Sequence, residues 1–197
     1  MQDFCERVRG AFLQQQAPGS TPAQVKDAAI WLEDFQGTRE AWAVSDQLLA
    51  QPVYETVGAG PQVFAAQTMR TKIQFDWAEL PADSQISLRT SLIAHLVRFR
   101  NGPQPVLTQL CLSICMLTLQ MQAWHTAVND LVVALTQPPE DAADKLPCLL
   151  ELLTVLPEEA HSTKVPLAIA AFASKPDDGH LRRLECYRKD ATSSKAC

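Results

Sequence analysis

Turn-forming residues divide the first 161 residues into eight short segments, each with the apolar spacing of an amphipathic helix. The segments come in pairs, and a pair recurs about every 40 residues. Helical hairpins at a period of roughly 40 to 47 residues are typical of HEAT and armadillo solenoids. Short loops also allow a compact helical bundle. The spacing therefore predicts an all-α protein, with a solenoid and a bundle as the two alternatives.

The breaks between segments also predict where individual helices begin. Thr21 has the side chain of an N-cap, and Pro22 suits the first turn of the second helix. Thr38 is expected to cap the third helix, and Asp83 or Ser84 the fifth. For the first, fourth, seventh and eighth helices the predicted bounds are 4–15, 64–77, 123–135 and 144–156.

The charge is unevenly distributed along the chain, whose net charge is −5. Residues 1–160 contain 18 acidic and 10 basic side chains, whereas residues 161–197 contain 4 and 7. An acidic body is a poor nucleic-acid binder and a plausible receptor for basic protein segments. We therefore predict a helical domain over 1–161 and a divergent, poorly ordered tail over 162–197, with no nucleic-acid partner.

No segment has the properties of a membrane anchor or signal peptide. The longest apolar stretch, 106–119, falls short of the roughly 20 residues that span a bilayer. The first ten residues lack an apolar signal core. Three of the six cysteines lie in apolar helical runs, where a thiol packs as a small hydrophobe. These features predict a soluble intracellular chain with free thiols and no membrane partner.

The sequence contains no arrangement of residues that indicates catalysis. The four histidines are scattered, and His95 is interpreted as a packed or capped side chain on an apolar helix. Cys111 and Cys115 are surrounded by leucines, which favours core packing over metal binding. No glycine-rich phosphate loop occurs. We predict that the chain is not an enzyme, with no catalytic residue, no metal site and no cofactor.

One helical segment, FAAQTMRTKIQFDW at 64–77, combines an apolar seam with a polar stripe. Gln67, Arg70 and Gln74 are three and four residues apart, so they share one face of a helix. The apolar seam consists of Phe64, Ala65, Met69 and Ile73. Such a stripe is either an ordinary solvated face or a polar surface prepared for a partner.

FAAQTMRTKIQ resembles a segment from the second repeat of the importin-β superfamily, also called karyopherins. Four further segments agree with this family in order and spacing. They are AAIWLEDFQGTREAWAVSDQLL (28–49), ELPADSQISLRTSLIAHL (79–96), VLTQLCLSICMLTLQM (106–121) and LLELLTVLPEE (149–159). Over residues 4–161 the chain is similar to the amino-terminal repeats of the transportin-SR and importin-thirteen branch of the superfamily.

The resemblance implies a solenoid of about four HEAT repeats, each an outer and an inner helix. The inner helices would span 23–36, 61–76, 104–120 and 144–157 and line the concave face. In this family the amino-terminal repeats dock the small GTPase Ran in its GTP form. By resemblance, the candidate Ran-binding residues are Gln67, Arg70, Lys72, Gln74, Gln109, Glu151 and Glu158.

The resemblance further implies nuclear protein import, with the chain in cytoplasm and nucleus. In the full-length family the cargo is basic protein such as serine/arginine-rich proteins, and nucleoporins are a further candidate partner. The family continues with many more repeats where this chain runs into 162–197, so we expect a truncated product with an exposed apolar flank on the eighth helix. The alternative function is a HEAT-repeat interaction scaffold without transport activity.

Overall fold

The computed structural model describes residues 2–53, 57–121, 123–137 and 142–161, which form eight α-helices and one short 3-10 helix. The predicted tail, 162–197, lies outside the described residues. The helices are α1 (Gln2–Gln16), α2 (Pro22–Gln36), α3 (Ala41–Ala50), α4 (Gly60–Phe75), η1 (Trp77–Glu79), α5 (Ala82–Arg98), α6 (Gln104–Gln120), α7 (Ala127–Thr136) and α8 (Ala142–His161). The prediction of an all-α fold is confirmed.

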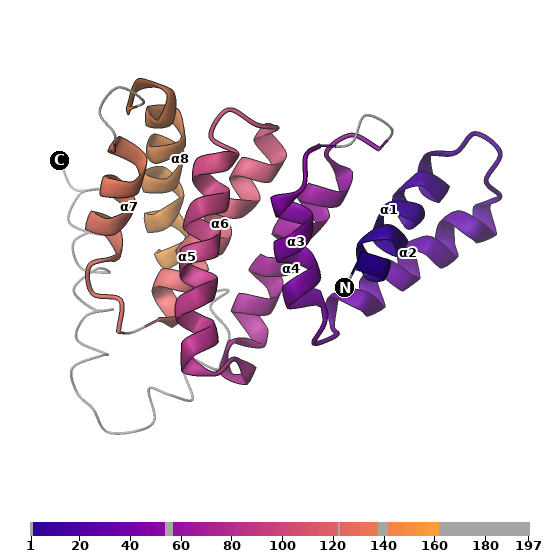
Figure 1. Ribbon diagram of the computed structural model, residues 1–197, viewed down its shortest axis with the longest axis horizontal. Helices are drawn as coiled ribbons and strands as arrows, with labels where there is room; N and C mark the ends of the chain where they lie inside the picture. Colours follow the sequence, from indigo (N-terminus) through magenta and orange to yellow (C-terminus); the bar gives the residue numbers. More distant parts are fainter. Residues whose placement is uncertain (1, 54–56, 122, 138–141, 162–197) are drawn as a thin grey trace.

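Consecutive helices pair as hairpins, and the hairpins follow one another along the long axis of the molecule (Figure 1). Within the hairpins α1 packs on α2, α3 on α4, α5 on α6 and α7 on α8. Between hairpins, α4 packs on α6 and α6 on α8, while α3 contacts α1 and α5. Each hairpin thus packs mainly on its neighbours, which confirms the solenoid over the bundle.

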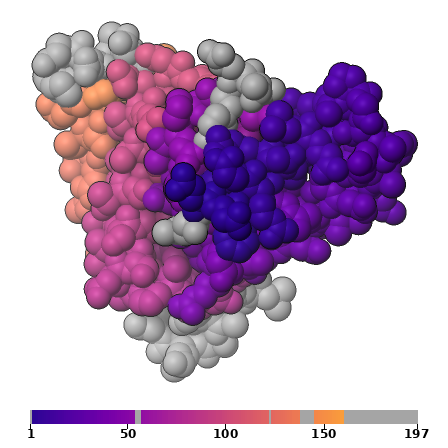
Figure 2. Space-filling view, turned by 45° about the vertical axis from the view of Figure 1, so that its right-hand side comes forward, coloured from indigo at the N-terminus to yellow at the C-terminus, as the bar shows by residue number. Residues whose placement is uncertain are grey.

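The first hairpin stands out from the rest of the molecule at the N-terminal end (Figures 1 and 2). Its helix α1 packs on both α3 and α4. Its helix α2 is tied to α4 at its last residue, where Gln36 Nε2 donates to Thr68 Oγ1 at 2.9 Å. The C-terminal end of α2 is therefore positioned against α4, and this places Gln36 beside the polar stripe of that helix.

The hydrophobic core runs through all four hairpins and is densest around α6. Leu110, Ile114 and Leu117 of α6 have no exposed surface, which fits a helix covered by α4, α5 and α8. The seam predicted on α4 is also buried, with Phe64, Ala65, Met69 and Ile73 at most 7% exposed. Apolar burial on this scale is the main force that holds the hairpins together.

Two of the predicted helix caps are wrong, whereas the one at Thr21 is confirmed. Thr21 Oγ1 accepts from the Gln24 backbone N–H in a complete capping box. Thr38 instead donates its hydroxyl to the Phe35 carbonyl oxygen at 2.8 Å, so it closes α2, and α3 begins at Ala41 without a side-chain cap. Helix α5 begins at Ala82, behind the extended Pro81, which places Asp83 and Ser84 inside the first turn.

The seventh and eighth helices also differ from their predicted bounds. Helix α7 begins at Ala127 because Asp130 holds the preceding turn: Trp124 Nε1 and Thr126 Oγ1 donate to Asp130 Oδ2 at 2.8 and 2.9 Å. Helix α8 runs to His161 and contains Pro147 and Pro157.

The expected apolar flank of α8 is present as three leucines at helical spacing. Leu146, Leu150 and Leu153 are 40–56% exposed. The stripe that they form is centred about 120° around the helix from that of Cys148, Leu149 and Leu152, which are at most 7% exposed.

Burial predicts a large difference between two identical substitutions in this fold. Leu110→Ala removes a fully buried side chain and leaves a cavity in α6, so it should lower the free energy of unfolding by about 2–5 kcal/mol. Leu150→Ala, at a position that is 56% exposed, should change it by less than about 1 kcal/mol. Urea denaturation of both variants measures the difference. Equal losses would contradict the packing of α6 described above.

Candidate functional site

A surface hollow of about 400 Å³ lies where α2, α4 and α6 meet. We call it the polar hollow, because all of its lining side chains are polar: Gln36, Gln67, Arg70, Thr71, Gln74 and Gln109. Four of the candidate residues from the sequence, Gln67, Arg70, Gln74 and Gln109, are thus brought together in one place. The sequence reasoning missed Gln36, which only tertiary packing brings there, and Thr71, which shares the helix face.

Helical periodicity and two interhelical hydrogen bonds produce this arrangement. On α4 the lining residues follow the spacing i, i+3, i+4 and i+7, which places them on one face. Helix α6 is held against α4 by Ser113 Oγ, which donates to the Ala66 carbonyl oxygen at 3.2 Å. Gln120 Nε2 likewise donates to the Gln74 carbonyl oxygen at 3.3 Å. The hollow is therefore supported by a rigid helix pair.

Arg70 is the charged residue of the polar hollow. Its ion-pair partner belongs to the fourth hairpin, whereas Arg70 itself belongs to the second. Its Nη2 lies 3.6 Å from Oε1 of Glu159 on α8, with the two side chains 32% and 17% exposed. The ion pair crosses α6, which lies between α4 and α8. Glu159 was not among the predicted residues. Glu158, which was predicted as a Ran-binding residue, is exposed and lies one position away, about 100° around the helix.

Lys72 is placed away from the polar hollow, which corrects the expectation that it flanks the stripe. Its side chain is 1% exposed, and Nζ donates to Asp76 Oδ2 at 2.7 Å. The ammonium group also lies 5.3 Å from the centre of the Trp42 ring on α3, in a cation–π contact. Two residues of helix rotate a side chain by about 200°, so Lys72 faces the hairpin partner α3 while Arg70 faces the hollow.

Glu151 forms a second polar link between α8 and α6, outside the polar hollow. Its carboxylate accepts hydrogen bonds from Gln104 Nε2 and Thr108 Oγ1, both at 2.5 Å. Both carboxylate oxygens are engaged, so Glu151 stabilises the packing of the fourth hairpin on the third. Of the seven predicted residues, Lys72, Glu151 and Glu158 are thus not part of the hollow.

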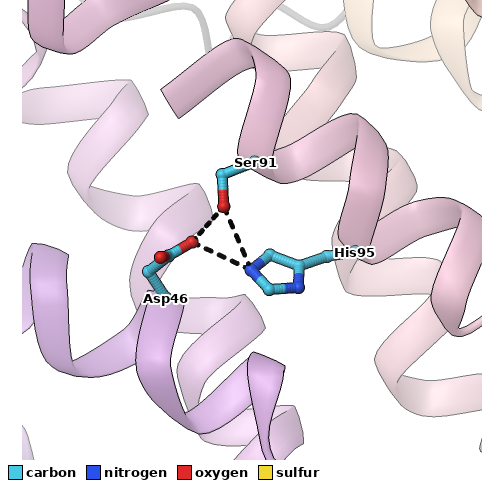
Figure 3. A network of polar contacts seen from close by, with 3 residues as sticks. All are labelled: Asp46, Ser91 and His95. Carbon is cyan, nitrogen blue, oxygen red and sulfur yellow. Dashed lines mark hydrogen bonds and ion pairs between the residues drawn. The ribbon is translucent and has the colours of Figure 1, made fainter. Parts of the chain in front are cut away.

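A cluster of Asp46, Ser91 and His95 joins α3 and α5, the first helices of the second and third hairpins (Figure 3). His95 Nε2 lies 2.9 Å from Asp46 Oδ1 and 3.3 Å from Ser91 Oγ, which also donates to Asp46. A catalytic triad needs the serine and the aspartate on opposite ring nitrogens, whereas here both contact Nε2. The arrangement is a structural link, and it confirms the packed role expected for His95.

This link changes the pKa of the Asp46 carboxyl group. The hydrogen bond from His95 holds the pKa of Asp46 below its usual value; burial opposes this, and the Ser91 hydroxyl assists it. Ser91 and His95 share a face of α5 at i and i+4, a spacing visible in the sequence. Asp46 lies 45 residues before Ser91, and no sequence pattern connects the two.

The four cysteines of the described residues are buried free thiols, as predicted for those in apolar runs. Burial raises the pKa of Cys115 to about 12, so the thiol stays protonated at neutral pH. Within the described ranges no group of three His, Cys, Asp or Glu side chains is arranged to hold a metal ion. No helix there is both long and apolar enough to cross a membrane.

Stacked helical hairpins with polar contacts between their second helices define a helical-repeat protein, and comparison with known families identifies its class. The model of the importin-beta N-terminal domain matches residues 28–98, and that of exportin 1-like protein matches residues 103–171. The two matches together cover most of the chain. The chain belongs to the importin-β superfamily, as its resemblance to that family predicted.

Individual relatives agree with the family. Transportin MOS14 of Arabidopsis thaliana is 34% identical over 165 residues, which are 83% of this chain and 15% of that protein. Importin-13 of Homo sapiens is 36% identical over 143 residues, which are 71% of this chain and 14% of that protein. An uncharacterized protein of Schizosaccharomyces pombe, C11G11.07, is 33% identical over 137 residues. The chain thus spans about 14–15% of the length of these relatives.

The Asp46 link predicts a stability difference that depends on pH. Asp46→Asn removes the charge but keeps the shape, and it should lower the free energy of unfolding near pH 7 by up to about 1 kcal/mol. Because the folded pKa of Asp46 is lowered, its contribution is fully present above the usual value of about 3.9 and is lost as pH falls through the folded value. Denaturant unfolding of variant and wild type between pH 7 and 2 measures this.

Asp27→Asn is the control, because Asp27 is an exposed carboxylate on α2. It should leave the stability profile close to that of the wild type. An Asp46→Asn deficit that stays constant down to pH 2 would contradict the electrostatic origin of the link.

Proposed function

We propose that this chain is the amino-terminal portion of a nuclear import receptor and that its second helices dock Ran in the GTP form. Three observations support the proposal. The chain belongs to the importin-β superfamily, its relatives carry the names importin and transportin, and the polar hollow presents a cluster of hydrogen-bonding side chains on a rigid apolar support.

The observation that carries the docking site is the grouping of Gln67, Arg70, Gln74 and Gln109 around one hollow. Side chains of this kind recognise the polar surface of a protein, because amides both donate and accept hydrogen bonds and the guanidinium group pairs with a carboxylate. Buried residues such as Ile73 and Ile114 hold the two helices behind the hollow, so little order has to be gained on binding.

A transport receptor of this kind works in both the cytoplasm and the nucleus, where Ran in its GTP form would release the cargo. The acidic body of the chain suits basic protein cargo, such as serine/arginine-rich proteins. Cargo and nucleoporin binding stay proposals for the longer protein, because the chain spans about 14–15% of its relatives.

Binding to Ran in its two nucleotide states tests the proposal. The full chain should bind Ran loaded with a non-hydrolysable GTP analogue and bind the GDP form more weakly. Arg70→Glu replaces the positive charge in the polar hollow by a negative one. Binding should weaken by about tenfold or more, because the new carboxylate would face the carboxylate of Ran that Arg70 would otherwise pair with. Biolayer interferometry with immobilised Ran measures both effects.

Lys26→Glu is the matched control, since it makes the same change of charge at an exposed position on α2 outside the polar hollow. It should bind Ran like the wild type. Binding without nucleotide preference would refute the receptor and favour the interaction scaffold. An equal loss in both variants would show that net charge, and not the hollow, determines binding.

A further inference from the structure

Arg70 is only partly satisfied within the chain. Its ion pair with Glu159 spans 3.6 Å, which is longer than a good hydrogen bond between these groups. Its Nε is buried and has no hydrogen-bond partner. A guanidinium group offers five N–H donors, and a well-placed carboxylate engages two of them at once. Because the Arg70 side chain is 32% exposed, the accessible part of its guanidinium group can bind a second or a better-placed carboxylate.

The surroundings of Arg70 favour a carboxylate over other groups. The other five lining residues of the polar hollow are neutral amides and one hydroxyl, which both donate and accept hydrogen bonds and so do not select the charge of a partner. Arg70 supplies the formal charge of this lining, and it is positive. A carboxylate pairs with this charge and can accept hydrogen bonds from the neighbouring amides, whereas the charge repels an ammonium or guanidinium group.

Glu159 is positioned to occupy Arg70 when no partner is bound. Its carboxylate reaches Arg70 from α8, on the other side of α6. Both charges also act on the buried Cys115 of α6, whose pKa is raised mainly by burial, further raised by Glu159 and lowered by Arg70. Arg70 is 32% exposed, so the ion pair is reached by solvent and is weakly held. An incoming carboxylate with better geometry competes for the same guanidinium group.

We propose that Glu159 is an internal competitor for Arg70, and that a carboxylate of the docking protein displaces it from the polar hollow. The inference rests on the proposed function and adds the chemistry of the contact: an Asp or Glu side chain of the GTPase pairs with Arg70. Glu159 then returns to solvent at the edge of α8.

The substitution Glu159→Gln tests the competition directly. It removes the competing charge and keeps the size of the side chain, so binding of Ran in its GTP form should become about two- to fivefold tighter. Glu33→Gln is the matched control, because it removes an exposed carboxylate on α2 outside the polar hollow. It should leave affinity unchanged. Titration calorimetry of the full chain with GTP-loaded Ran measures the dissociation constants.

A double-mutant cycle adds a readout that net charge alone does not move. In an Arg70→Gln background, Glu159→Gln should no longer tighten binding, because no cation is left to compete for. A gain that persists in this background, or an equal gain from Glu33→Gln, would overturn the inference.

The outcomes also separate this inference from the proposed function. Nucleotide-dependent binding of the wild type with no gain from Glu159→Gln overturns the competition and leaves the receptor function standing. If Ran does not bind at all, the receptor function fails. Titration with an oligoglutamate peptide then decides the competition: tighter binding by Glu159→Gln supports it, and equal or absent binding overturns it.

Discussion

The need to cover α6 on nearly every side determines how this molecule is built. Its apolar residues point in most directions, and Leu110, Ile114 and Leu117 have no exposed surface. A helix of this kind is stable only when several others surround it. Helices α4, α5 and α8 do so, and this fixes the second helices of three hairpins side by side. Polar residues on the remaining faces of those helices are then held at constant distances from one another.

The polar links between helices depend on the apolar packing around α6. Ser113 and Gln120 donate to backbone carbonyl oxygens of α4, and Glu151 accepts from the side chains of two α6 residues. Each bond contributes modestly, about 1 kcal/mol, because water competes for the same groups. Their combined effect is to fix the rotation of each helix, so that the polar hollow has one shape. The apolar packing around α6 provides most of the stability, and the polar contacts fix how each helix is rotated against its neighbours.

Periodicity predicted the parts of the site that lie on one helix, and failed where tertiary packing decides. Gln67, Arg70 and Gln74 share a face because of helix geometry alone, so the sequence was sufficient for them. The expectation that Lys72 flanks the stripe failed because the packing of α3 against α4 buries that side of the helix, which the spacing within one segment does not show. Gln36, Glu159 and the Asp46 link required the positions of other helices, which no spacing within one segment gives.

The Arg70–Glu159 ion pair is unusual for a solenoid because it joins hairpins that are not neighbours. In repeat proteins stability is mainly a sum of terms within hairpins and between adjacent ones. This pair links the second hairpin to the fourth across α6. A carboxylate that displaces Glu159 from Arg70 would remove that link, while the apolar packing around α6 stays intact. The packing of α8 on α6 and the hydrogen bonds of Glu151 do not involve Arg70, so the fourth hairpin would keep its place when this ion pair is broken.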